Sequence, residues 1–78
     1  MPPSDSQPDW VIARRRAIGD RIRAARLHAN LTQERLAEQA GMDRQAVNRI
    51  EQGHTSPKID TLIRLAAAID VPLADLVQ

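Results

Sequence analysis

Apolar residues recur along this 78-residue chain at the spacing typical of α-helices. Near the N-terminus, steps of four and three residues lead from Val11 through Ile18 and Ile22 to Ala29. Residues at this period lie on one side of a helix and can face a core. A second stripe of the same kind consists of Ile59, Leu62, Leu65, Ala66 and Ile69. No segment has the pattern of a strand, so the sequence predicts an all-α protein.

Residues that favour helix ends divide the chain into five predicted helices. These run from a cap at Asp9 to about Ala29, from Gln33 to about Ala40, over 43–52, from Pro57 to about Ile69, and from Leu73 to Val77. Ser, Thr and Asp accept hydrogen bonds at helix starts, whereas Gly and Asn tolerate the left-handed turn after a helix. The expected starts are marked by Thr32, Asp43 and Ser56-Pro57, and the expected ends by Asn30, Gly41 and Gly53.

The first eight residues differ from the rest, because three of them are proline and the others are mostly small or polar. Such a segment cannot bury enough surface to fold. We therefore expect a disordered arm over 1–8 and one domain over 9–78. The N-terminus has no apolar run of the kind that marks a secretory signal.

The composition excludes several kinds of site. The chain has no cysteine and only two histidines, so we expect neither a disulfide nor a bound metal. No stretch approaches the ~20 apolar residues of a membrane span. No glycine-rich phosphate loop or nucleophile with a partner base is present, so an enzyme is not expected. We expect a cytoplasmic protein without cofactor, membrane contact or an evident small-molecule effector.

Basic residues are concentrated in the middle of the chain, although the formal net charge of the whole is only +1. Residues 14–58 carry ten basic and five acidic side chains, which gives them a net charge of +5. The segments 1–13 and 59–78 each carry a net charge of −2. A basic section suits a nucleic-acid partner, although solvated helix faces are often rich in arginine as well.

The two short helices predicted at 33–40 and 43–52 have the features of a helix-turn-helix. This motif needs a small residue where its helices cross and a glycine in the turn, and Ala37 and Gly41 meet these needs. It also needs apolar residues that anchor the second helix, which Val47 and Ile50 supply.

The outward side of the 43–52 helix carries the polar residues Arg44, Gln45, Asn48 and Arg49. Arginine can bond both acceptors of guanine, and Gln or Asn matches the donor and acceptor of adenine. Such a face alone would more often be an ordinary solvated surface. Its combination with the turn favours a helix that reads base edges in the major groove.

Two stretches of the sequence resemble the Cro- and phage-repressor-like helix-turn-helix family, also called the XRE type. They read LTQERLAEQAGMDRQAVNRIEQG and SPKIDTLIRLAAAIDVPLADLV, and together they cover more than half of the chain. The resemblance implies a compact five-helix fold of the lambda-repressor type. It also implies a transcriptional regulator, repressor-like, that binds double-stranded DNA.

The resemblance assigns roles to residues outside the reading helix. It implies that Gln33 bonds a DNA phosphate. It also implies that Arg26 and Glu51 form a salt bridge between the first and third helices, with Arg26 facing the DNA backbone. The loop and helix start that would touch the sugar-phosphate backbone contain His54, Thr55, Ser56 and Lys58.

One reading helix contacts too few base pairs to specify a single site in a genome. Related proteins act as two-fold dimers whose reading helices enter successive major grooves, about 34–36 Å apart. We therefore expect a homodimer on an inverted-repeat operator. The expected interface is C-terminal and consists of Leu73, Leu76, Val77 and Ile63. The long first helix with Trp10 is a second candidate.

Two other interpretations stay open at this point. The chain could be an antitoxin or a restriction–modification controller of the same fold, which would bind DNA at one particular locus. It could also be a protein-interaction module that uses its third helix on another protein. The basic, hydrogen-bonding surface argues against the second, because protein interfaces favour aromatic anchors.

Overall fold

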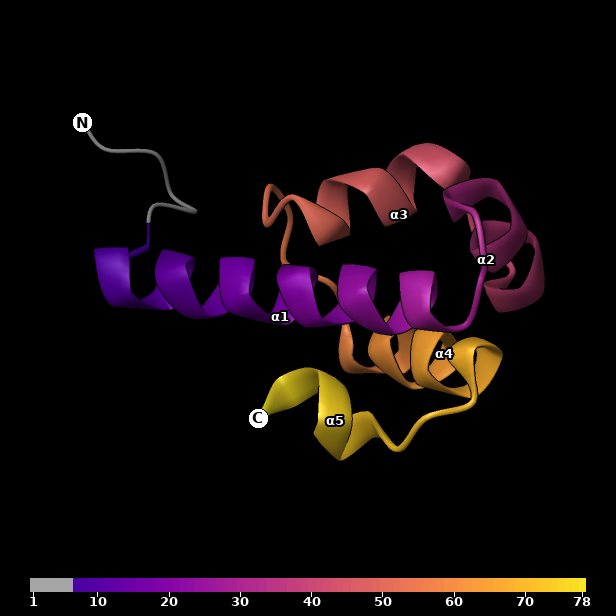
Figure 1. Cartoon of the computed structure of the whole chain (residues 1–78). Helices are drawn as coiled ribbons and strands as arrows, with labels where there is room; N and C mark the ends of the chain where they lie inside the picture. The colour runs from indigo at the N-terminus through magenta and orange to yellow at the C-terminus, as the bar shows by residue number, and fades with distance from the viewer. Residues whose placement is uncertain (1–6) are drawn as a thin grey trace.

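The computed structural model describes residues 7–78, and within this range all regular structure is helical. The five helices are α1 (Asp9–His28), α2 (Gln33–Ala40), α3 (Arg44–Glu51), α4 (Ile59–Ile69) and α5 (Leu73–Val77). The prediction of an all-α fold is confirmed. α1 crosses the molecule between α3 on one side and α4 and α5 on the other, and α2 lies at its C-terminal end, where it packs against both α3 and α4 (Figure 1). Most of the arm predicted over 1–8 lies outside the described residues.

Every helix contributes one fully buried aliphatic side chain to a single core. These side chains are Ile22, Leu36, Val47, Leu65 and Leu76. Each gains roughly 1.5–3 kcal/mol by leaving water. Because the five come from five helices, the core closes only when all the helices are in place. Among the helices described, none combines the length and apolar composition needed to cross a bilayer.

α1 and α3 approach each other closely because each side supplies a glycine at the point of contact. A Cβ atom on Gly19 would lie 2.5 Å from the carbonyl oxygen of Ile50 and 2.6 Å from that of Glu51. A Cβ atom on Gly53 would lie 2.6 Å from Cγ of Arg16. Ordinary side chains at these positions would force the helices apart. The two glycines therefore set the position of α3 against α1.

Four helix ends use the same pair of backbone hydrogen bonds, in which the residue after the helix turns left-handed. After α3, for example, His54 N–H donates to the Arg49 carbonyl (2.9 Å), and Gly53 N–H donates to the Ile50 carbonyl (3.0 Å). The left-handed residues are Asn30, Gly41, Gly53 and Asp70. The ends predicted at Asn30, Gly41 and Gly53 are therefore confirmed. Asp70 shows that aspartate, too, accepts this conformation when its N–H is bonded.

The start of α1 differs from the prediction. Asp9 is the first helical residue, and Pro8 holds the cap position without a side-chain hydrogen bond. Proline suits this place, because it has no N–H to satisfy and its fixed φ leads into a helix. At the other end, Ala29 lies just beyond α1 and is exposed, so its predicted inward position is wrong.

The predicted start of α4 at Ser56-Pro57 is also wrong. The segment stays extended through Lys58, whose ψ is 156°, and the helix begins at Ile59. Pro57 is half-buried and lines the same hollow as Ile50 and Leu62, which holds the segment against the core rather than in a first helical turn. Ile59, expected in the core, is the first residue of the helix and is 66% exposed.

Candidate nucleic-acid interface

α3 divides into a buried side and an exposed side, as the sequence predicted. Val47 and Ile50 are buried against the other helices. Arg44, Gln45 and Arg49 are exposed. A helix anchored in this way presents its polar side chains from a rigid support.

The turn between α2 and α3 has the geometry of a helix-turn-helix. Thr32 caps α2, and its Oγ1 accepts a hydrogen bond from Arg35 N–H at 3.0 Å. Ala37 and Ala40 are both small and buried on α2, which packs against α3 and α4. Gly41 then turns the chain with φ +71°. These features place the start of α2 and the exposed side of α3 next to each other.

A buried ion pair joins α1 to α3. Nε of Arg26 donates to Oε2 of Glu51 at 2.7 Å, and its Nη2 donates to Oε1 at 3.0 Å. Nη1 of Arg26 donates to the carbonyl oxygen of Leu31 at 2.9 Å. Arg26 is only 7% exposed and Glu51 only 4%. The pair expected from the family resemblance is present. Arg26 also lines a shallow hollow with Thr32, Gln33 and Arg44, so its expected contact with the DNA backbone stays a prediction.

A network of side-chain amides lies between this ion pair and the exposed side of α3. Nε2 of Gln33 donates to Oε1 of Glu51 and to Oδ1 of Asn48, both at 3.2 Å. Nε2 of Gln52 donates to the same Oδ1 at 3.3 Å. Asn48 is half-buried between them. Both hydrogens of Gln33 Nε2 are therefore used inside the protein, which leaves its Oε1 as the free polar atom.

Gln52 is the member of this network that sequence reasoning missed. The only available signal was its spacing, since it follows Asn48 by four residues and so lies on the same side of a helix. Among the described residues, no buried side-chain nitrogen or oxygen lacks a hydrogen-bond partner. The unbonded polar atoms of the layer between α2 and α3 are therefore ones that reach solvent.

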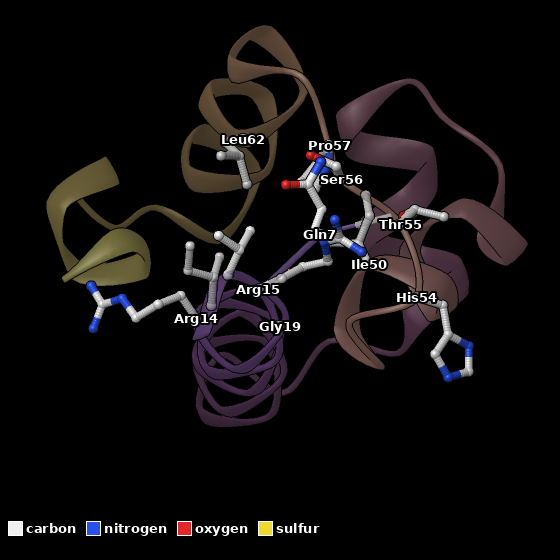
Figure 2. A pocket seen from close by; sticks show the side chains of 12 residues that line it. Gln7, Arg14, Arg15, Gly19, Ile50, His54, Thr55, Ser56, Pro57 and Leu62 are labelled. Carbon is white, nitrogen blue, oxygen red and sulfur yellow. The ribbon is translucent and has the colours of Figure 1, made fainter. Parts of the chain in front are cut away.

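The segment between α3 and α4 borders an open hollow of about 670 Å³ on the α1 side. Ile50, Ser56 and Pro57 gather around it, whereas the guanidinium of Arg14 and the ring of His54 point away (Figure 2). His54, Ser56 and Lys58 are exposed, and Thr55 is half-buried. The predicted backbone-contacting segment is thus accessible from the outside of the loop.

The C-terminal residues expected at a dimer interface are less accessible than predicted. Leu76 is fully buried in the core of its own chain and offers no surface to a partner, so that expectation is corrected. Leu73 and Val77 are half-buried. Ile63 is 48% exposed and Trp10 71% exposed.

The arrangement of α2, α3 and the turn between them defines a helix-turn-helix protein. A sequence profile of the helix-turn-helix family matches residues 22–76, which is more than half of the chain. The chain therefore belongs to this family of DNA-binding transcriptional regulators. The recognition made from its two sequence stretches is confirmed.

Particular relatives agree with this assignment. The chain is 35% identical over 60 residues to the immunity repressor protein of Bacillus phage phi105, covering 77% of this chain and 42% of the relative. It is 37% identical over 61 residues to the cryptic phage CTXphi transcriptional repressor RstR of Vibrio cholerae, covering 78% and 55%. The chain thus spans about half the length of these two relatives.

One solved structure is matched over nearly the whole of its chain, unlike the two repressors. The restriction–modification controller protein C.AhdI of Aeromonas hydrophila superposes with a TM-score of 0.81 at 33% identity. The match covers 82% of this chain and 97% of that one. The five-helix architecture is therefore shared with a known regulator.

Proposed function

We propose that this protein is a sequence-specific transcriptional regulator, repressor-like, that inserts α3 into the major groove of double-stranded DNA. The observation that carries the proposal is the division of α3. Arg44, Gln45 and Arg49 project to solvent from a helix whose other side is buried. These side chains match the hydrogen-bonding groups on base edges. An isolated polar helix would lack this fixed orientation.

The DNA backbone would be held on both sides of α3. On one side, the start of α2 offers free backbone N–H groups, which bind anions. Because Gln33 uses both hydrogens of its amide internally, its backbone N–H is the better phosphate donor. On the other side lie the exposed His54, Ser56 and Lys58, with Thr55 between them. Such contacts position the protein without reading sequence.

A homodimer would let two copies read the halves of an inverted repeat. Leu76 has no free surface, so the proposed interface moves to the exposed apolar residues Ile59 and Ile63, four residues apart on α4. Ile63→Ser should then weaken self-association in sedimentation equilibrium, while the unfolding midpoint stays the same at a concentration where both proteins are monomers. A weakened dimer after Trp10→Ala instead would place the interface on α1.

A controller of a restriction–modification locus is the second candidate function. It is favoured by the extent of the match to C.AhdI, which includes nearly the whole of that chain. Both candidates use the same DNA-binding surface. They differ in which promoter carries the operator, so a binding site next to a methyltransferase or endonuclease gene would support the controller.

Selection of binding sites from random duplex DNA tests the proposal directly. We expect the purified protein to enrich an inverted repeat with half-sites about one helical turn apart. The triple variant Arg44→Ala, Gln45→Ala, Arg49→Ala is the control, because its core is unchanged, and it should enrich nothing. If the native protein also enriches nothing and its binding disappears at moderate salt, only phosphate attraction remains and the proposal fails.

A further inference from the structure

The side-chain hydrogen bonds between α2 and α3 have a fixed order of donors and acceptors, which is set by the carboxylate of Glu51. Its carboxylate is held by Arg26 through two hydrogen bonds. A carboxylate accepts hydrogen bonds and donates none. An amide that faces it must therefore present its NH2 group. Gln33 does so, with its Nε2 3.2 Å from Oε1 of Glu51.

Gln33 in turn fixes the orientation of the Asn48 amide. Its second amide hydrogen is directed at Oδ1 of Asn48, again at 3.2 Å. Gln52 donates to the same oxygen at 3.3 Å. A carbonyl oxygen has two lone pairs, and both are now used. If the Asn48 amide turned over, its NH2 group would face the NH2 group of Gln33, and neither could accept.

We propose that Asn48 therefore meets DNA only as a hydrogen-bond donor, through Nδ2. Paired recognition of adenine by Asn needs its oxygen to accept from N6 while its nitrogen donates to N7. In this protein the oxygen is occupied by Gln33 and Gln52. The groups left for Nδ2 are acceptors in the major groove, namely purine N7, guanine O6 and thymine O4.

This inference replaces the adenine preference that the sequence predicted for Asn48. It makes Gln33 and Gln52 positioning residues for specificity, although neither need touch a base. It rests on the proposed function, because Asn48 reads a base only if α3 enters the major groove. The polarity of the amide network, in contrast, is a property of the free protein.

NMR of the free protein tests the network without DNA. The side-chain NH2 hydrogens of Gln33 should exchange slowly with water, because both are bonded in a half-buried site. Those of Asn48 should exchange fast, because they have no partner within residues 7–78. The opposite order, with Asn48 protected, would overturn the inference.

Base analogues test the contact on DNA. The base pair read by residue 48 is identified as the position whose preference disappears in sites selected by Asn48→Ala. Adenine, 7-deazaadenine or purine, which lacks the N6 amine, is then placed there. Loss of N7 should weaken binding about tenfold, whereas loss of the amine should change it less than about twofold. An equal loss for both analogues would show paired recognition and overturn the inference.

A double variant should release the constraint. In Gln33→Leu with Gln52→Ala, Oδ1 of Asn48 becomes free, so the preference for adenine over purine at that position should rise about tenfold. The exposed Gln39 lies on α2 outside the network, and Gln39→Ala should leave the preference unchanged. Gln52→Ala alone alters only an exposed side chain and shows whether a folded variant moves the same way.

The NMR and DNA-binding experiments together distinguish failure of this inference from failure of the proposed function. Slow exchange at Gln33 without any selected DNA site would overturn the proposed function and base reading by Asn48 with it. A clear operator combined with fast exchange at Gln33 and sensitivity to the N6 amine would leave the proposed function in place and overturn the donor-only contact.

Discussion

α3 is a short helix of eight residues, and its two sides have different roles. The inner side, with Val47, Ile50 and Glu51, is buried and fixes where the helix lies. The outer side, with Arg44 and Arg49, touches solvent. The inner side therefore determines whether the helix is presented at all, and the outer side determines what it could recognise.

This division separates two kinds of mutational effect. Changes on the inner side should lower the free energy of unfolding and reduce DNA binding only through the loss of folded protein. Changes on the outer side should alter DNA binding but change the free energy of unfolding by no more than about 0.5 kcal/mol. Asn48 lies between the sides and is the place where the division is least sharp.

The largest effect is expected for Glu51→Ala on the inner side. It leaves the buried guanidinium of Arg26 without its partner, which should cost about 3–5 kcal/mol of unfolding free energy. Urea denaturation followed by circular dichroism measures this loss. The paired variant Arg26→Met, Glu51→Leu should regain most of the stability, because two apolar residues replace both charges. If the single variant is as stable as the native protein, the inner side does not depend on the pair.

Gly19→Ala should have the next largest effect on stability, and two contributions to this effect oppose each other. Alanine favours a helix over glycine by about 0.5–1 kcal/mol. Its Cβ would nevertheless lie 2.5–2.6 Å from two backbone carbonyl oxygens at the end of α3. Overpacking of this kind costs about 1–3 kcal/mol, so we expect a net loss and a lower thermal midpoint. A higher midpoint would mean that α1 and α3 can separate without penalty.

The local features of α2 and α3 were predictable from sequence because their causes are local. Thr32 and Gly41 act on the residues next to them, and the helical period of Val47 and Ile50 reveals a buried side. The exposed side of α3 follows from the same period, so the candidate reading residues could be identified, although their contacts with DNA remain predictions.

The remaining features depend on residues far apart in the chain. Gly19 inside a helix gives no sign that carbonyl groups of α3 lie against it. The period of α4 groups Ile59 with the core, but Ile59 is the first residue of the helix and is mostly exposed. Likewise, the partners of Gln33 and Asn48 are set by how α2 approaches α3, which no local pattern encodes.

Arg49→Ala tests the outer side. It should cost about 1–3 kcal/mol of binding free energy on the selected operator and relax the preference at one base position. The unfolding midpoint should stay the same, because the side chain is exposed. Arg64→Ala is the matched control, because Arg64 is an exposed arginine on α4, outside the proposed reading side of α3. Equal losses on operator and random DNA would contradict direct reading by Arg49.

Lys58→Ala should give the smallest effect and complete the contrast. Lys58 is exposed just before α4 and lies outside α3, so its charge would meet phosphate rather than a base. Binding to operator and to random duplex should weaken by the same factor. The slope of log K against log salt concentration should become shallower by about one, since one fewer counterion is released. A loss confined to the operator would mean that the loop takes part in sequence reading, and specificity would then extend beyond the outer side of α3.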